Sequence, residues 1–270
     1  MAADGLWREK GKLVIRAKGR RPLAGYFWAG MLLLTLLSVS FLDIHWLRLV
    51  TRLGDLGTIF GRMLHFNFHD WDVVLLAFAE TFSIMVLATL YSILSGLVLG
   101  LLAARNVDGC RPLAAAVLAF SALLRAVPTP VWVLLTLVCF GFGPEAGIVG
   151  LFVHTTAFFA RAFAQAFEDV PGDVLEALAA LGAGKLQIIC CALLPSAATQ
   201  LLAWLAMRFE VNFSECAILG MVGAGGIGFV ISTSLQSYDY GTAGLAILLV
   251  FGFAFFMERG FMYVKQAVNK

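Results

Sequence analysis

Charged side chains are scarce in this sequence. Only 13% of its 270 residues are Asp, Glu, Lys or Arg, and 61% are apolar, whereas soluble domains carry about 25% charged and roughly 45–50% apolar residues. A soluble fold of this length could not bury so much apolar surface, but lipid can cover it. The net charge of +2 is also too small to indicate a nucleic-acid partner. The composition therefore indicates a membrane protein.

Catalytic and metal-binding patterns are missing as well. The sequence contains no Ser/His/Asp or Cys/His arrangement, no HExxH pattern and no Walker motif. We therefore expect no enzymatic activity, no cofactor and no metal site, and any ATP must be hydrolysed by another chain. The cysteines are odd in number and lack metal-ligand spacing, so we expect inert apolar side chains at Cys110, Cys139, Cys190, Cys191 and Cys216.

Long apolar runs are what the sequence has in abundance. A helix of about 20 apolar residues crosses a bilayer, so we predict an all-α, polytopic membrane domain over 23–270 that follows a basic tail over 1–22. The first run is longer than the roughly 7–15 residues of a signal-peptide core and no convincing cleavage site follows it, so we expect an uncleaved span. The six predicted transmembrane helices are 23–42, 82–104, 126–142, 146–160, 196–222 and 241–257.

Lys and Arg are distributed unevenly between the two sides of these spans. With six spans both termini share one side, and that side collects 14 of the 19 Lys and Arg residues. The opposite side holds Arg48, Arg52 and Arg62. Because Lys and Arg accumulate in cytoplasmic loops, we expect a multi-pass protein of the bacterial inner membrane with both termini in the cytoplasm.

The long outer loop over 43–72 mixes acidic residues and histidines with aromatic ones. Their spacings match no tight metal site, and we favour an amphipathic segment that lies on the outer membrane interface. The residues considered are His45, His65, His69, Asp43, Asp55, Asp70 and Asp72.

A short helix is predicted in the second cytoplasmic loop, over 168–190. Pro171 suits its first turn, Asp169 is available as a cap, and Gly182 ends it after about three turns. Its apolar stripe consists of Val174, Leu178 and Leu181, and Glu176, Ala177 and Ala180 lie off that stripe. So short a helix is unstable alone in water. It therefore needs a groove on another protein or on the rest of this chain.

The residues of this loop resemble the EAA loop of ATP-binding-cassette (ABC) importer permeases. Glu176-Ala177 is followed by Gly182, six positions after the Glu, and then by Leu193-Leu194-Pro195. In that family the loop is the coupling helix, which sits in a cleft of the ATPase subunit. An ordinary interfacial helix is the alternative. The resemblance implies that the residues coupling to the ATPase are Glu176, Ala177, Leu178, Leu181 and Gly182.

Further segments over about 75–265 resemble the phosphonate-type permeases of this family, which include relatives for phosphite and hypophosphite. The segments are Glu80-Thr81, 125–132, 208–212 and 219–228. The resemblance implies the type I ABC importer permease fold and a phosphorus oxyanion as substrate. The chain departs from the family two positions after Asn212, where an Arg often stands and this sequence has Ser214, with Glu215 next.

Charged residues interrupt the apolar runs, at roughly 2.5–3.5 kcal/mol each if they lie deep in the bilayer. They either pair with one another inside the bundle or line a polar path for an anion. Arg208 is the best single candidate for the path, because a guanidinium donates two parallel hydrogen bonds to an oxyanion. The translocation-path candidates are Arg125, Arg208, Glu210, Asn212, Ser214 and Glu215.

Glycines cluster after the fifth predicted span. The run from Gly223 to Gly228 formally fits the dinucleotide fingerprint, but that site needs a strand before it and a helix after it. We instead expect a glycine turn at which the span breaks and re-enters, because irregular backbone at membrane depth must line a cavity or be buried in protein. The gate candidates are Gly223, Gly225, Gly226 and Gly228. A second small-residue stripe, Ser92, Gly96 and Gly100, is expected to pack against a neighbouring span or a second copy.

The sequence leaves two functions from different classes. The first is the permease subunit of an ATP-driven importer for phosphonate, phosphite or hypophosphite. Its partners would be a cytoplasmic ABC ATPase dimer, a second permease copy and a periplasmic or lipid-anchored substrate-binding protein. The second is an ion-coupled secondary transporter of a small anion, with Glu210 and Glu215 as ion sites. It would need no docking helix, and such transporters usually show inverted repeats.

Overall fold

The computed structural model describes residues 6–9, 12–15, 22–42, 45–108 and 110–268. It divides into two units, one ending at Thr58 and the other beginning at Ile59. In the first unit, β1 (Leu6–Glu9) and β2 (Lys12–Ile15) form an antiparallel hairpin within the predicted basic tail. The other tail residues up to 21 lie outside the described part of the chain. The first predicted span corresponds to α1 (Pro22–Phe41).

The predicted amphipathic segment after the first span is a helix, α2 (Trp46–Leu64), which begins in the first unit and ends in the second. Its apolar and charged residues occupy opposite faces. The apolar face includes Trp46, Leu53, Phe60 and Leu64, and the charged face includes Arg48, Asp55 and Arg62. Its location on the outer membrane interface stays a prediction, and Asp43 lies outside the described residues.

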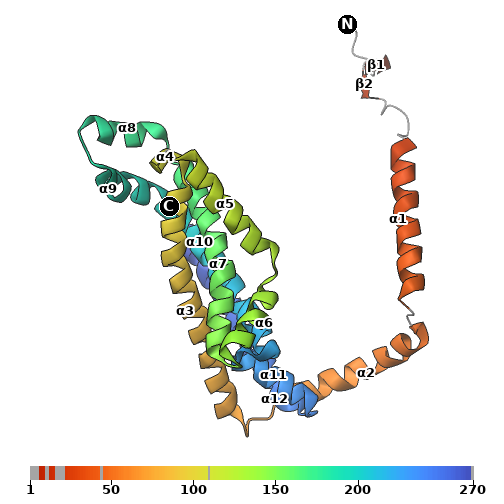
Figure 1. The fold of residues 1–270 in the computed structure, drawn as a ribbon. Coiled ribbons are helices and arrows are strands. Elements are labelled where there is room, and N and C mark those ends of the chain that lie inside the picture. The colour runs from red at the N-terminus through yellow and green to blue at the C-terminus, as the bar shows by residue number, and fades with distance from the viewer. Residues whose placement is uncertain (1–5, 10–11, 16–21, 43–44, 109, 269–270) are drawn as a thin grey trace. The chain divides into compact units, whose positions relative to one another are not determined.

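The second unit is a helical bundle (Figure 1). Two of its elements, η1 and η2, are π-helical turns that continue a neighbouring α-helix. Its elements after α2 are α3 (Trp71–Ala103), α4 (Arg105–Asp108), α5 (Arg111–Ala126), α6 (Thr129–Phe140), α7 (Pro144–Glu168), α8 (Gly172–Ala180), α9 (Lys185–Ile188), η1 (Ile189–Leu193), α10 (Leu194–Leu219), η2 (Gly220–Ala224), α11 (Gly226–Gln236) and α12 (Tyr240–Val268).

Within the described residues, four helices are long and apolar enough to cross a membrane: α3, α7, α12 and the continuous helix from α9 through η2. Two bent pairs, α1 with α2 and α5 with α6, raise the number to six if each pair is one span. The six-span prediction agrees with this upper count. Four predicted spans are too short. α3 begins at Trp71 rather than at residue 82, and α7 runs to Glu168 rather than to residue 160. The helix at the fifth span covers 185–224 rather than 196–222, and α12 runs to Val268 rather than to residue 257.

The predicted third span over 126–142 is wrong. α5 ends at Ala126, Val127 and Pro128 are extended, and α6 leaves at 86° to α5. The cause is Pro128, which lacks an N–H group and disfavours a helical conformation at Val127, whereas Pro130 lies in the first turn of α6, where proline is tolerated. With 12 residues α6 is about 18 Å long, too short for a hydrocarbon core of roughly 30 Å. The element at this place is therefore the bent pair over 111–140.

The bundle is built around α7, whose apolar stretch is 61% buried, the largest share among the four long helices. The small-residue stripe of α3 faces α7 of the same chain. A Cβ on Gly100 would lie 2.8 Å from the Cβ of Phe163, and one on Gly96 would collide with Phe159. Ser92 Oγ donates a hydrogen bond to the carbonyl of Phe152 at 3.3 Å. Small side chains therefore let the backbones of α3 and α7 approach closely.

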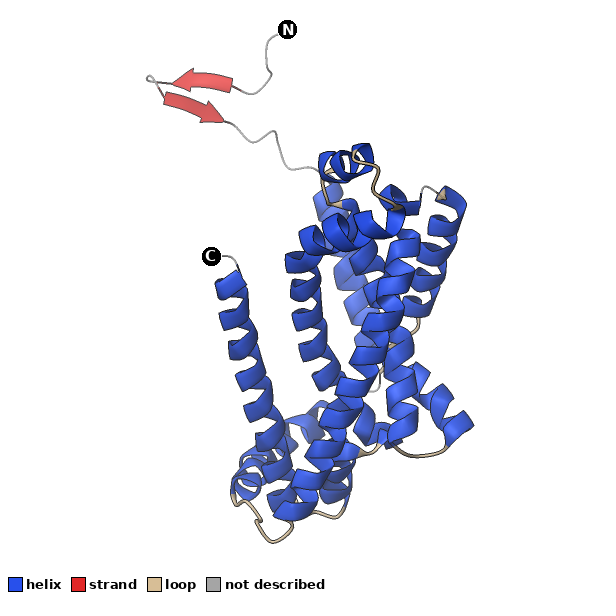
Figure 2. Ribbon diagram, turned by 90° about the vertical axis from the view of Figure 1, so that its left-hand side faces the viewer, coloured by secondary structure: helices blue, strands red, loops and turns tan. Residues whose placement is uncertain are grey.

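The two ends of the bundle carry different features. Figures 1 and 2 show α8 and α9 at one end and α11 at the other, with α12 running from the α11 end back toward the α8 end. The predicted docking helix and the predicted gate therefore lie at opposite ends of this unit.

Candidate functional site

The predicted docking helix is α8. It begins at Gly172 and ends at Ala180, and Gly182 takes the left-handed φ of +83° that favours glycine. Pro171 is the N-cap residue rather than part of the first turn. The expected cap, Asp169, is wrong: it ends α7 in a helical conformation, and its carboxylate accepts a hydrogen bond from Gln200 Nε2 at 2.9 Å.

The apolar stripe of α8 is turned relative to the prediction. Leu175 and Leu178 are half-buried against the bundle, while Val174 is 37% and Leu181 86% exposed. The reason is the short length of α8, whose last turn ends before Leu181 and leaves this side chain outside the packed face. Predicted coupling residues Glu176 and Ala177 are exposed too. α8 therefore offers a carboxylate, small side chains and one leucine to the surroundings.

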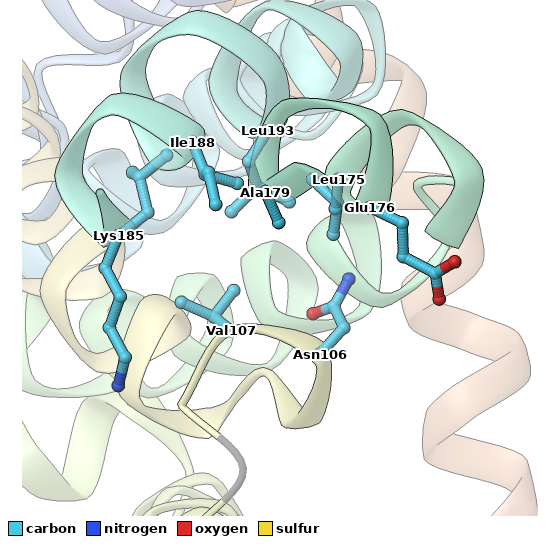
Figure 3. Close-up of a pocket in the computed structure, with 9 residues that line it drawn as sticks. Asn106, Val107, Leu175, Glu176, Ala179, Lys185, Ile188 and Leu193 are labelled. Atoms are coloured by element: carbon cyan, nitrogen blue, oxygen red, sulfur yellow. The ribbon is translucent and has the colours of Figure 1, made fainter. Parts of the chain in front are cut away.

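A cavity of about 210 Å³ lies behind α8 (Figure 3). Apolar side chains from four elements line it, among them Val107 of α4, Leu175 of α8 and Ile188 of α9, and the Glu176 carboxylate points away from it. Its wall on the α4 side is held in place because Asn106 Nδ2 donates a hydrogen bond to the carbonyl of Phe167 at 2.7 Å. Asn106 and Val107 belong to no sequence motif. Their place in this wall is set only when the segment that contains α4 packs beside the segment that contains α8 and α9.

A chain of hydrogen bonds joins buried polar residues of α3, α7 and α10. Asn212 is fully buried and donates to Thr89 Oγ1 at 2.8 Å, and its amide oxygen accepts from Thr155 Oγ1 at 3.1 Å. Arg208, 6% exposed, donates from Nη2 to Thr155 Oγ1 at 3.2 Å. Of these residues only Arg208 and Asn212 were predicted, because Thr89 and Thr155 stand in apolar runs without a distinguishing pattern.

Arg208 forms its ion pair with Glu215, not with Glu210. The Nη2 to Oε2 distance is 3.0 Å, and Thr129 at the start of α6 lies beside the same carboxylate. Seven residues on a helix are close to two full turns, so both side chains lie on one face, whereas Glu210 is on the other side of α10. Ser214 is exposed, and its hydroxyl donates to the carbonyl of Glu210 at 3.3 Å. The structure thus does not bring Glu210 and Ser214 into this cluster.

Arg125 reaches the same region from the end of α5. Its Cζ lies 5.8 Å from the centre of the Phe158 ring, and Arg208 Cζ lies 5.4 Å from the same ring. Both distances are within the range of cation–π contacts. The two guanidiniums therefore share one aromatic ring, Arg125 from the exposed side and Arg208 from the interior.

The glycine run at the other end forms a break followed by a short helix. Gly223, Gly225 and Gly226 have φ values of +122°, +82° and +69°, so side chains are disfavoured there. Gly228 lies against α10, where a Cβ would collide with the carbonyl of Ala217.

Two residues of α3 hold this break in place. The Glu80 carboxylate accepts a hydrogen bond from Gly226 N at 3.1 Å, and Thr81 Oγ1 accepts one from Ile227 N at 2.8 Å. They satisfy the first amide groups of α11, which no helical carbonyl can reach. The motif Glu80-Thr81 and the glycine run, 146 residues apart in sequence, are thus parts of one structural feature.

Comparison with known proteins places these features in a family. Residues 96–267 match the family described as binding-protein-dependent transport system inner membrane component. Over 202 residues the chain is 33% identical to the phosphate-import permease protein PhnE of Mycolicibacterium smegmatis, a match that covers 74% of this chain but only 38% of PhnE. It is 30% identical over 247 residues to the phosphite transport system permease protein PtxC of Stutzerimonas stutzeri, covering 91% of this chain and 84% of PtxC.

A solved structure is similar in fold. It is that of the MetNI methionine ABC transporter in an inward facing conformation. The match has a TM-score of 0.60 and 25% sequence identity, and it covers 71% of this chain and 94% of the other.

Proposed function

Because the chain belongs to the family of binding-protein-dependent transport system inner membrane components, we propose that it is the membrane-spanning permease subunit of an ATP-driven importer. The observation that carries the proposal is α8, a nine-residue helix at one end of the bundle with Glu176 exposed and turned away from the chain. Such a surface suits a groove on a partner, and the matched region includes it. Its family and its long apolar helices make the chain a multi-pass protein of the inner membrane.

The partners follow from this role. A cytoplasmic ATPase dimer would receive the coupling residues Glu176, Ala177, Leu178, Leu181 and Gly182, and a substrate-binding protein would deliver the cargo outside. ATP-driven closure of the ATPases would draw the coupling helices together and turn the path outward, and hydrolysis would reset it. Both termini would lie in the cytoplasm, on the same side as α8.

A second permease copy fits the surface of α10. α10 belongs to the continuous helix from α9 through η2, and only 17% of the apolar stretch of that helix is buried within the chain, against 61% for α7. Met207, Val211, Ser214 and Ile218 recur along one face of α10 and are all exposed. We therefore expect two copies to meet, or to enclose the path, along this face.

The substrate is a phosphorus oxyanion. Two relatives support this class by their names, a phosphate-import and a phosphite transport system permease, and two arginines near one buried cluster provide the cationic groups. Arg125, Arg208, Asn212 and Glu215 belong to the translocation path in this proposal, and the glycine break with Gly223, Gly225, Gly226 and Gly228 forms its gate.

Phosphite uptake by cells that express the complete transporter tests the coupling role. Glu176→Ala should lower uptake by about tenfold or more, since losing a hydrogen bond to a charged group is worth roughly 1.5–3 kcal/mol, while the amount of chain in the membrane stays unchanged. Glu145→Ala is the matched control. This carboxylate lies in the first turn of α7, whereas α8 follows the last turn of α7. Normal uptake by Glu176→Ala would rule out coupling through α8. Uptake that persists without an ATPase would indicate a secondary transporter instead.

A further inference from the structure

Several buried polar atoms around Phe158 have no hydrogen-bond partner within the described residues. They are Arg208 Nε, His154 Nδ1 and Trp204 Nε1. Buried polar groups are nearly always paired, so each unpaired atom needs an explanation. Arg208 and Trp204 lie one turn apart on α10, and His154 lies one turn before Phe158 on α7. The unpaired atoms therefore come from two helices that meet at one aromatic ring.

Contacts place these groups in one cluster. The Trp204 ring meets Phe158 edge-on, with 5.9 Å between the ring centres. Arg208 and Arg125 lie over the same Phe158 ring at 5.4 and 5.8 Å, and His154 is within electrostatic reach of both guanidiniums. Arg125 is exposed at the end of α5, whereas Arg208 is 94% buried. The cluster thus runs from the surface of the chain to its interior.

The formal charges of the cluster do not cancel. Arg208 and Glu215 bring one positive and one negative charge to the interior, and Arg125 adds a second positive charge at the exposed end of the cluster, so one positive charge is left to attract an anion. Charged side chains within membrane-spanning helices are costly, and they mark a candidate functional site. The Glu215 carboxylate, 3.0 Å from Arg208, occupies the position that an oxyanion would take on this guanidinium.

We propose that Arg208 and Arg125, with Trp204 and His154 as further polar contacts, form a binding site for one small tetrahedral phosphorus oxyanion, and that Glu215 is an internal carboxylate that the anion displaces from Arg208. This inference rests on the proposed transport function and adds to it the place where the cargo halts. The anion first meets Arg125 at the surface. It then takes the place of Glu215 on Arg208, whose Nε–H and Nη2–H together match two oxygens of one anion.

Displacement of Glu215 by the anion gives the Arg208–Glu215 pair a role in transport. While the site is empty, Glu215 keeps Arg208 from standing unpaired, which would destabilise the bundle. When the anion binds, the freed carboxylate stays beside Thr129 at the break between α5 and α6. Occupancy of the site is thereby linked to the bent third span. The anion also binds weakly, because the Glu215 carboxylate competes with it for Arg208. Weak binding suits a transport site, which must release its substrate.

Isothermal titration of the purified full chain with sodium phosphite tests this site. Glu215→Gln removes the competing charge and should tighten phosphite binding by about tenfold, because the apparent affinity is reduced by the fraction of sites in which Arg208 is free. Arg125→Gln should weaken binding by about tenfold. This residue is exposed, so the variant should fold. Trp204→Phe keeps the ring against Phe158, loses only the N–H group, and should weaken binding by a few-fold.

Controls separate a binding role from a structural one. Arg111→Gln changes the same residue type at the opposite end of α5 and should leave phosphite binding unchanged. If Glu215 is only a structural partner of Arg208, Glu215→Gln will lower the melting temperature without tightening phosphite binding, and the site is overturned. An unchanged dissociation constant in Arg125→Gln also overturns it.

The uptake experiment on Glu176 keeps this inference distinct from the proposed function. If Glu176→Ala abolishes uptake but phosphite does not bind at this cluster, the importer stands and the site falls. If phosphite binds with the expected ranking of variants but uptake does not depend on Glu176, the site stands and the coupling assignment falls.

Discussion

Buried polar residues in the middle of α10 are organised by hydrogen bonds that cross between helices. Asn212 joins Thr89 of α3 to Thr155 of α7, and Arg208 adds a bond to Thr155. In a bundle whose apolar side chains gain little from packing against each other rather than against lipid, such bonds and close packing carry much of the specificity. Asn212 is therefore a structural centre of the three helices as well as a candidate for the path.

Replacing Asn212 tests this at the level of one residue. Asn212→Ala should lower the free energy of unfolding by about 1–3 kcal/mol, because the buried Thr89 hydroxyl loses its donor and the buried Thr155 hydroxyl loses its acceptor. The measurement is the thermal unfolding midpoint of the chain purified in detergent. Ser214→Ala on the same helix is the control, since this exposed hydroxyl bonds only to a carbonyl of its own helix. Equal midpoints for the two variants would contradict the structural role of Asn212.

Residue types in this cluster were only partly predictable. Arg208, Asn212 and Glu215 are visible in the sequence because polar residues are rare in apolar runs. Their pairing is not visible, because a helix presents each side chain to several neighbours and tertiary packing selects one. Thr155 and Trp204 have no sequence signal of their own, since both residue types are common in apolar helices, and His154 belongs to no motif.

At the scale of elements, α11 depends on α3 for its first turn. The amides of Gly226 and Ile227 are bonded to Glu80 and Thr81, and the left-handed residues Gly225 and Gly226 bring the backbone close to these side chains. A Cβ on Gly225 would lie 2.7 Å from Glu80 Oε1. Glycine is therefore required here both by φ and by the close approach of a carboxylate.

Removing the carboxylate should loosen α11. In Glu80→Ala the amide group of Gly226 at the start of α11 loses its acceptor, a change worth about 0.5–2 kcal/mol in other helices. Hydrogen–deuterium exchange of residues 226–236 should speed up by about tenfold, while exchange in α7 stays the same. Asp72→Ala, an exposed acidic residue in the first turn of α3, is the control. If α11 exchanges equally slowly in both variants, Glu80 does not hold the gate.

For the whole molecule, the distribution of burial points to a second copy. α10 holds the most buried charged side chain of the described bundle, yet the continuous helix to which it belongs, from α9 through η2, has the least buried apolar stretch of the four long helices. Its exposed face carries Met207, Val211, Ser214 and Ile218. α10 carries candidate residues of the translocation path and has an exposed face. We therefore expect this face at the interface of two copies that enclose the path.

Crosslinking in membranes tests this arrangement. Ser214→Cys, in a background in which the five native cysteines are replaced by Ala, should give a covalent dimer with a short bismaleimide. Ser83→Cys, an exposed serine on α3, is the matched control and should stay monomeric. Dimers formed equally by both variants would indicate random collision. The absence of a dimer in Ser214→Cys would favour a second, distinct permease or another face.

The sequence by itself determined that this is a membrane protein with up to six spans, because apolar runs of bilayer length have only one stable environment. It also determined where α8 ends and where the fifth span breaks, because proline and glycine act on the local backbone. Only the tertiary structure decided that Arg208 pairs with Glu215 and that Glu80 caps α11. These contacts join residues that are far apart in the chain or on a helix, and their geometry exists only after the helices have packed.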